Sequence, residues 1–77
     1  MNVLKIEIQR NEKIDNSKQM AYYCDKDFFT ALVTLCDELG VEVPVWTTNE
    51  ERILEKKGQL DLDLENGAVM RIYSNME

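Results

Sequence analysis

Three acidic side chains at every second position are the residues of this chain whose types and spacing come closest to a metal site. Asp61, Asp63 and Glu65 lie within the stretch GQLDLDLENGAVMRIY, and carboxylate oxygens are the ligands that Ca²⁺ takes in proteins. A calcium loop places glycine at its sixth position and a bidentate glutamate at its twelfth. Counted from Asp61, those positions hold Asn66 and Ile72. The spacing therefore favours the solvated face of a β-hairpin over a metal site.

The two thiols are the candidates for nucleophilic chemistry. Cys24 and Cys36 are twelve positions apart, which differs from the CxxC spacing of redox and zinc pairs. The chain has no histidine, the side chain that most often serves as general base near neutral pH. Cys24 precedes the expected start of a helix, but Asp25 and Asp27 oppose a thiolate there. A small thiol- or carboxylate-dependent enzyme is an alternative, and we assign no catalytic residue, metal or cofactor.

The composition describes one small acidic domain. The chain is 44% hydrophobic, with one proline and three glycines, as is typical of a folded globular chain. We predict a single domain over residues 1–77, with the thin core of a short chain. Residues 21–51 hold seven acids and one base, Lys26, within a net charge of −6, so this part repels nucleic acid. Apolar stretches are far shorter than the roughly 18 residues that span a bilayer, which predicts a cytoplasmic protein that binds no membrane.

Alternating apolar and polar residues predict a hairpin at the start of the chain. Residues 3–10 (VLKIEIQR) show the two-residue period of a half-buried strand, and residues 19–25 (QMAYYCD) are interpreted as its partner. The polar stretch 11–18 (NEKIDNSK) is expected to connect them as a turn-rich loop. Tyr22 and Tyr23 point to opposite faces of a strand, so at least one of them faces outward and is a candidate for an interface.

Residues 25–40 (DKDFFTALVTLCDELG) are expected to form the principal helix. Asp25 is a suitable N-cap, and Gly40 suits the left-handed conformation that follows a helix end. At about 100° per residue, one side of this helix gathers Phe28, Leu32, Leu35, Cys36 and Leu39. Phe29 and Val33 widen the apolar arc beyond what one sheet face covers. Their flank is expected to pack against the second helix and the connector, or against a second subunit.

A connector and a short second helix follow. Residues 41–46 (VEVPVW) alternate like a strand, but Pro44 has no donor for a ladder, which leaves an edge strand or an extended connector. Trp46 is interpreted as a lid on the end of the core, with a hot spot for a partner as the alternative. Residues 47–58 (TTNEERILEKKG) fit a helix that ends at Gly58. Its start has the spacing of a capping box, either Thr47 with Glu50 or Thr48 with Glu51.

The last hairpin can take two registers. A two-residue turn at Asn66 and Gly67 carries Arg71 onto the core side. A three-residue loop over residues 65–67, with Gly67 left-handed, shifts the register. Six apolar side chains then share one face: Leu60, Leu62, Leu64, Ala68, Met70 and Ile72. We predict this second register, in which Asp61 lies opposite Arg71 on the solvent face.

Together these elements predict an α+β fold of order ββα(β)αββ, in which residues 41–46 are the optional strand. We expect an antiparallel or mixed sheet of about four strands with the principal helix packed on one face.

The order of helix, turn, helix and hairpin from residue 25 to 73 resembles the helix pair and wing of a winged-helix DNA-binding protein. This resemblance implies a second helix that carries bases and reads DNA. In this chain, three acids balance three bases there: Glu50, Glu51 and Glu55 against Arg52, Lys56 and Lys57. DNA binding is therefore an alternative that the charge disfavours.

By elimination, the sequence predicts a small acidic cytosolic protein that acts as a non-enzymatic protein-interaction module or as a homo-oligomer. The expected partner is a second copy of the chain, as in a homodimer, or a basic protein. The candidate interface residues are Phe29, Val33, Trp46, Tyr22 and Tyr23.

Overall fold

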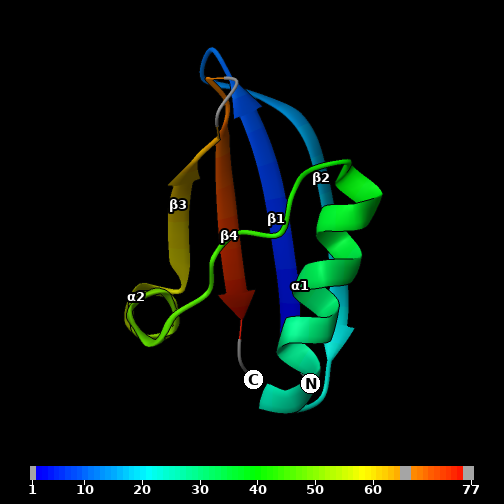
Figure 1. The fold of residues 1–77 in the computed structure, drawn as a ribbon, viewed down its shortest axis with the longest axis vertical. Helices are drawn as coiled ribbons and strands as arrows, with labels where there is room; N and C mark the ends of the chain where they lie inside the picture. The colour runs from blue at the N-terminus through cyan, green and yellow to red at the C-terminus, as the bar shows by residue number, and fades with distance from the viewer. Residues whose placement is uncertain (1, 65–66, 76–77) are drawn as a thin grey trace.

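Four strands and two helices make up the described part of the chain, residues 2–64 and 67–75 of a computed structural model (Figure 1). Their bounds are β1 (Asn2–Arg10), β2 (Lys13–Tyr22), α1 (Asp25–Leu39), α2 (Thr48–Lys57), β3 (Gln59–Asp63) and β4 (Val69–Asn75). The strands form one antiparallel sheet in the order β2-β1-β4-β3. Both helices pack on the same face of the sheet, which is called the inner face below. The predicted α+β fold is confirmed, and residues 41–47, the connector, form no strand.

The first hairpin is longer than the sequence pattern predicts. β2 begins at Lys13, so the loop predicted over residues 11–18 is wrong except for its first two residues. Asn11 and Glu12 have φ angles of 52° and 66°. A two-residue turn with both residues left-handed matches the twist of paired strands, and the chain can therefore pair again directly after the turn. The polar residues of β2 fit this position because they are exposed along an edge of the sheet.

The core lies between the inner face of the sheet and α1. Ile6, Ile72 and Leu60 lie side by side across β1, β4 and β3. The largest fully buried side chains come from both layers: Leu4, Ile6, Leu32, Leu35, Met70, Ile72 and Cys36. The apolar side predicted for the principal helix is thus its buried side, with Phe28 and Leu39 half-buried at its ends.

The helix ends follow the capping signals, with one correction. α1 is capped by Cys24, whose backbone is extended and whose side chain makes no capping hydrogen bond, so Asp25 is the first helical residue and not the N-cap. Gly40 ends α1 with a φ of 72°, as predicted. Of the two capping boxes that the spacing allows, α2 has the one formed by Thr47 and Glu50. Among the described residues, neither helix is long and apolar enough to cross a bilayer.

The register of the last hairpin is the predicted one that buries the leucines. Leu60 lies opposite Ile72, and Gly67 has a φ of 82°, as the three-residue loop requires. Residues 65–66 of this loop lie outside the described residues. Arg71 is on the face of the sheet opposite to the helices, which is called the open face below.

Candidate functional site

Part of the inner face is covered by the connector alone. α1 packs on β2 and β1, and α2 packs on β3 and β4. In Figure 1, α2 lies at the start of β3, and the connector crosses in front of β1 and β4 between the two helices. Leu62 and Leu64 are therefore only half-buried, although they belong to the inner face.

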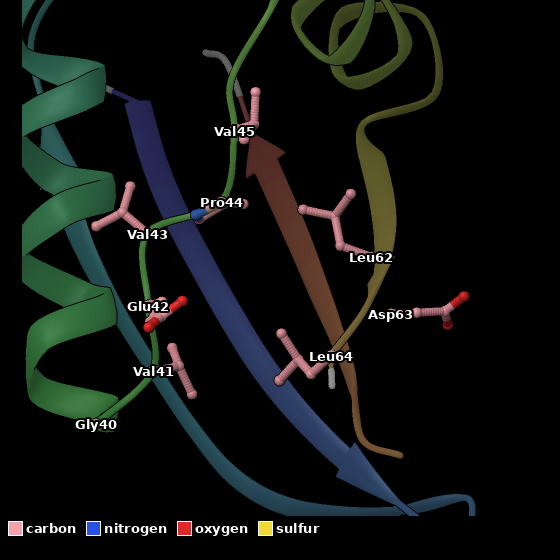
Figure 2. A pocket seen from close by; sticks show the side chains of 9 residues that line it. All are labelled: Gly40, Val41, Glu42, Val43, Pro44, Val45, Leu62, Asp63 and Leu64. Carbon is pink, nitrogen blue, oxygen red and sulfur yellow. The ribbon is translucent and has the colours of Figure 1, made fainter. Parts of the chain in front are cut away.

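A groove of about 640 Å³ lies between the connector and β3. Its lining comes from residues 40–45 and 62–64 and is mostly apolar. Figure 2 shows Leu62 extending from β3 toward the connector, whereas Asp63 points away from the groove. Glu42 is the other ionisable residue of this lining. Because its lining is mostly apolar, such a groove suits apolar side chains.

Exposed apolar side chains continue from the groove onto α1. Val43 and Val45 of the connector are 38% and 80% exposed, and Phe29 and Val33 of α1 are 50% and 38% exposed. These four residues are called the apolar surface below. The expectation that the second helix covers Phe29 and Val33 is therefore wrong, because α2 packs on the same face near the opposite edge of the sheet, on β3 and β4. The connector leaves both side chains partly exposed.

The connector runs back along α1, which brings the two parts of the apolar surface side by side. Val41 N donates to Cys36 O near the end of α1, and the Trp46 ring packs on Phe28 near its start. Figure 2 shows the Val43 side chain directed toward α1. In Figure 1, α1 runs upward in front of the sheet. A right-handed turn of about 100° per residue then carries the exposed apolar flank of α1 to the connector side.

Acidic residues border the apolar surface. Asp37 is exposed in the last turn of α1, one turn after Val33, and this turn contains no base; Glu42 is exposed in the connector. Like charges gathered on one side of a small protein produce a field that attracts ligands of the opposite charge. The apolar surface therefore has a negative border.

Of the other predicted interface residues, Tyr22 is excluded by its position in the core. It is 4% exposed, its hydroxyl hydrogen-bonds with that of Ser74 at 2.7 Å, and its ring packs edge-on against Phe28. Trp46 is half-buried, with its ring centroid 5.4 Å from that of Phe28, as the lid interpretation requires. Tyr23 is exposed after the end of β2, and its place in an interface stays a prediction.

Asp61 and Asp63 of the last hairpin lie on the open face. Arg71 donates two hydrogen bonds to Asp61, from Nε to Oδ1 at 2.8 Å and from Nη2 to Oδ2 at 3.2 Å. Gln59 donates a third to Asp61 at 3.3 Å. Among the described residues, no three His, Cys, Asp or Glu side chains gather as metal ligands, and Glu65 lies outside those residues. The structure therefore assigns Asp61 to an ion pair.

The Asp61–Arg71 pair is expected to appear in a titration of the folded protein. The hydrogen bonds from Arg71 lower the pKa of Asp61, and Arg71→Gln should return it toward the ordinary value of about 3.9. Because the folded-state pKa is depressed, the pair stabilises the fold at neutral pH, and this contribution is lost as the pH falls below about 4. NMR titration of the Asp61 carboxyl measures the shift. Arg10→Gln removes the same charge elsewhere and should leave Asp61 unchanged; equal effects of both variants would contradict the assignment.

Neither thiol has a hydrogen bond with a lysine or arginine in the described structure. Cys24 is exposed, and its Sγ lies 3.5 Å from Oδ2 of Asp27, so a thiolate there would face a carboxylate. Cys36 is buried in the core, and burial raises the pKa of its thiol. An activated cysteine requires electropositive surroundings, which these contacts do not provide.

Sequence reasoning found the α1 half of the apolar surface and missed the connector half. Val43 and Val45 carry a signal, the alternation of valine around Pro44, but alternation defines two faces without telling which one is covered. The groove leaves no sequence signal, because its walls come from segments about twenty residues apart in the chain.

The sheet, helices and connector define a small α+β domain of order ββααββ with an apolar surface bordered by acids. Asp61, Asp63 and both thiols lie outside this surface. No protein-family model, curated protein or solved structure matches this chain.

Proposed function

We propose that this protein is a non-enzymatic interaction module that binds another protein through the apolar surface. The observation that carries the proposal is the exposure of Phe29, Val33, Val43 and Val45 on two adjacent segments, beside a groove with apolar walls. Single exposed apolar residues are ordinary, whereas adjacent ones rimmed by polar residues mark interaction sites. Phe29 is the aromatic side chain of this surface and the natural anchor of an interface.

The border of the surface supports a basic partner over a second copy of the chain. Asp37 and Glu42 supply negative charge there, and the whole chain carries −6. A homodimer through this surface would bring two such borders together, and like charges placed across an interface oppose association. A partner with an apolar patch surrounded by lysine or arginine would instead be attracted.

A cytoplasmic setting belongs to this proposal. Cys24 and Cys36 are both free thiols, one exposed and one buried. Disulfides persist in oxidising compartments, whereas thiols are kept reduced in the cytosol. A small domain stabilised by its core without a disulfide suits a reducing compartment.

Size-exclusion chromatography with light scattering tests the choice between a different partner and a second copy. The proposal predicts the mass of one chain, 9.0 kDa, over a tenfold range of concentration. A mass of twice that value that persists on dilution would contradict the basic partner and show that a second copy of the chain is the partner.

Phe29→Asp is expected to weaken binding through the apolar surface. Removing a central aromatic anchor costs about 2 kcal/mol or more, which corresponds to roughly a 30-fold loss of affinity. The matched control is Thr30→Asp, which adds the same charge at the next, also exposed, position of α1. Proteins retained from cell extract by each immobilised variant are compared by quantitative mass spectrometry. A partner that Thr30→Asp retains and Phe29→Asp loses supports the proposal; identical sets for the wild type and both variants contradict it.

A further inference from the structure

β3 is an edge strand, and α2 lies beside the start of its outer side. In the sheet order β2-β1-β4-β3 it pairs with β4 alone. Figure 1 shows no further strand along its outer side in the described part of the chain, and α2 lies near its start. An edge of this kind presents backbone donors and acceptors that another chain can pair with.

Two hydrogen bonds at the ends of β3 show which of its backbone groups point outward. Ser74 N donates to Gly58 O at 3.2 Å, and Leu64 N donates to Ala68 O at 2.8 Å. Hydrogen-bonded pairs in an antiparallel ladder recur at every second residue, so the even-numbered residues of β3 bond to β4. The odd-numbered residues direct their N–H and C=O groups away from the sheet: Gln59, Asp61 and Asp63.

The opposite edge of the sheet, β2, is protected in ways that β3 is not. The register of β2 shifts opposite Ile8 and Gln9, and Lys13 and Lys18 are exposed along it. Bulges and lysines are common means by which an edge strand avoids pairing. β3 keeps a regular register over its five residues and contains no lysine or proline. An added strand would therefore meet a regular ladder at β3.

The side chains of β3 define what an added strand should carry. Leu60 and Leu62 lie on the inner face, whereas Asp61 and Asp63 lie on the open face with Arg71. Asp61 is paired with that arginine, but within the described residues Asp63 has no ion pair. Opposite charges and apolar side chains on neighbouring strands stabilise a sheet when they share a face. The complementary strand therefore carries apolar residues on its inner face and bases on its open face.

We propose that β3 binds an extended segment of a partner protein as a fifth strand, with apolar residues alternating with lysine or arginine. Main-chain hydrogen bonds to the odd-numbered residues of β3 supply affinity, and the alternate side chains supply specificity. If a second copy of the chain paired antiparallel about Asp61, the Asp61 carboxylates of the two copies would lie opposite each other and repel. The negative charge of β3 therefore favours a basic segment over a second copy. The proposal goes beyond the function proposed above and is independent of it, because it uses the backbone of β3 and not the apolar surface.

The test uses the wild-type chain labelled with ¹⁵N and a capped peptide of alternating valine and lysine, about six residues long like an ordinary strand. On binding, the amide protons of Asp61 and Asp63 should shift and exchange with solvent at least tenfold more slowly. Alternate residues of a strand direct their N–H groups to opposite edges. Two control peptides are therefore N-methylated, one at all valines and one at all lysines. One of them should lose at least tenfold in affinity and the other should bind as the parent does.

A variant of β3 gives a second, independent readout. Asp63→Pro removes an outward N–H without removing a hydrogen bond to β4 and should lower the affinity for the peptide at least tenfold. Asp63→Asn keeps this N–H and should lower affinity only a few-fold. Absence of binding at millimolar peptide, equal binding of both N-methylated peptides, or shifts confined to the apolar surface would each overturn the proposal. The last outcome would leave the proposed function standing. If Asp63→Pro fails to fold, the N-methylated peptides still decide, because they are tested on the wild-type chain.

Discussion

Ile72→Ala is expected to lower the free energy of unfolding by about 2–5 kcal/mol, the usual range when a buried isoleucine is truncated to alanine. Ile72 is fully buried and lies between Ile6 of β1 and Leu60 of β3. The cavity would open at the centre of the sheet, where the paired strands leave little room to collapse. A chain of 77 residues has a total stability of roughly 4–12 kcal/mol, so this one change removes a large part of it. Urea unfolding followed by far-UV circular dichroism measures the loss.

The matched control for this prediction is Ile14→Ala in β2. It removes the same atoms from a strand of the same sheet, but Ile14 is 58% exposed. The expected change is within about 0.5 kcal/mol, as for most surface substitutions. If the two variants lose equal stability, the core does not lie on the inner face as described.

Trp46→Ala is expected to lower the free energy of unfolding by about 2 kcal/mol, less than the roughly 3–5 kcal/mol of a fully buried aromatic residue. Trp46 is half-buried and packs on Phe28, which in turn packs edge-on against Tyr22 with 5.4 Å between ring centroids. Its removal would expose the Phe28 ring to water and release the end of the connector. Thermal and urea unfolding by circular dichroism measure the loss without relying on tryptophan fluorescence.

Tyr23→Ala is the control for the tryptophan, because Tyr23 is an aromatic residue near the same end of the fold but exposed. Its expected effect on stability is within about 0.5 kcal/mol. If Trp46→Ala also leaves stability unchanged, Trp46 is not a lid on the core, and the alternative interpretation as a hot spot for a partner gains support.

The fold was predictable wherever a local pattern admits one solution. The register of the last hairpin follows from Leu60 and its alternate neighbours, since a slip of one residue would expose every leucine. The capping box at Thr47 and the glycine at position 40 likewise act within a few residues of themselves. The start of β2 was not predictable in this way. It depends on the left-handed conformation of Glu12, which its residue type does not indicate, and on pairing with β1, which makes a polar segment a strand.

The candidate site was predictable only in part. Phe29 lies outside the arc of the helix that one face of a sheet can cover, so its exposure was predictable. In the structure it is half exposed. The two faces of Tyr22 and Tyr23 were also predictable, but not which of them enters the core, because that depends on the ring of Phe28 and on the neighbouring strand. The connector half of the apolar surface was not predictable from the sequence, because it depends on the path that the connector takes along α1 in the folded structure.

The sequence by itself determined which residues need burial, which helix face is apolar and how the last hairpin aligns, because helical and strand periods impose these at short range. Tertiary structure alone decided that α2 packs on β3 and β4, away from the flank of α1. It also decided that β3 lies at an edge with its odd-numbered backbone groups turned outward. Both outcomes depend on how segments distant in the chain divide one sheet between them, and no residue carries that information within its own neighbourhood.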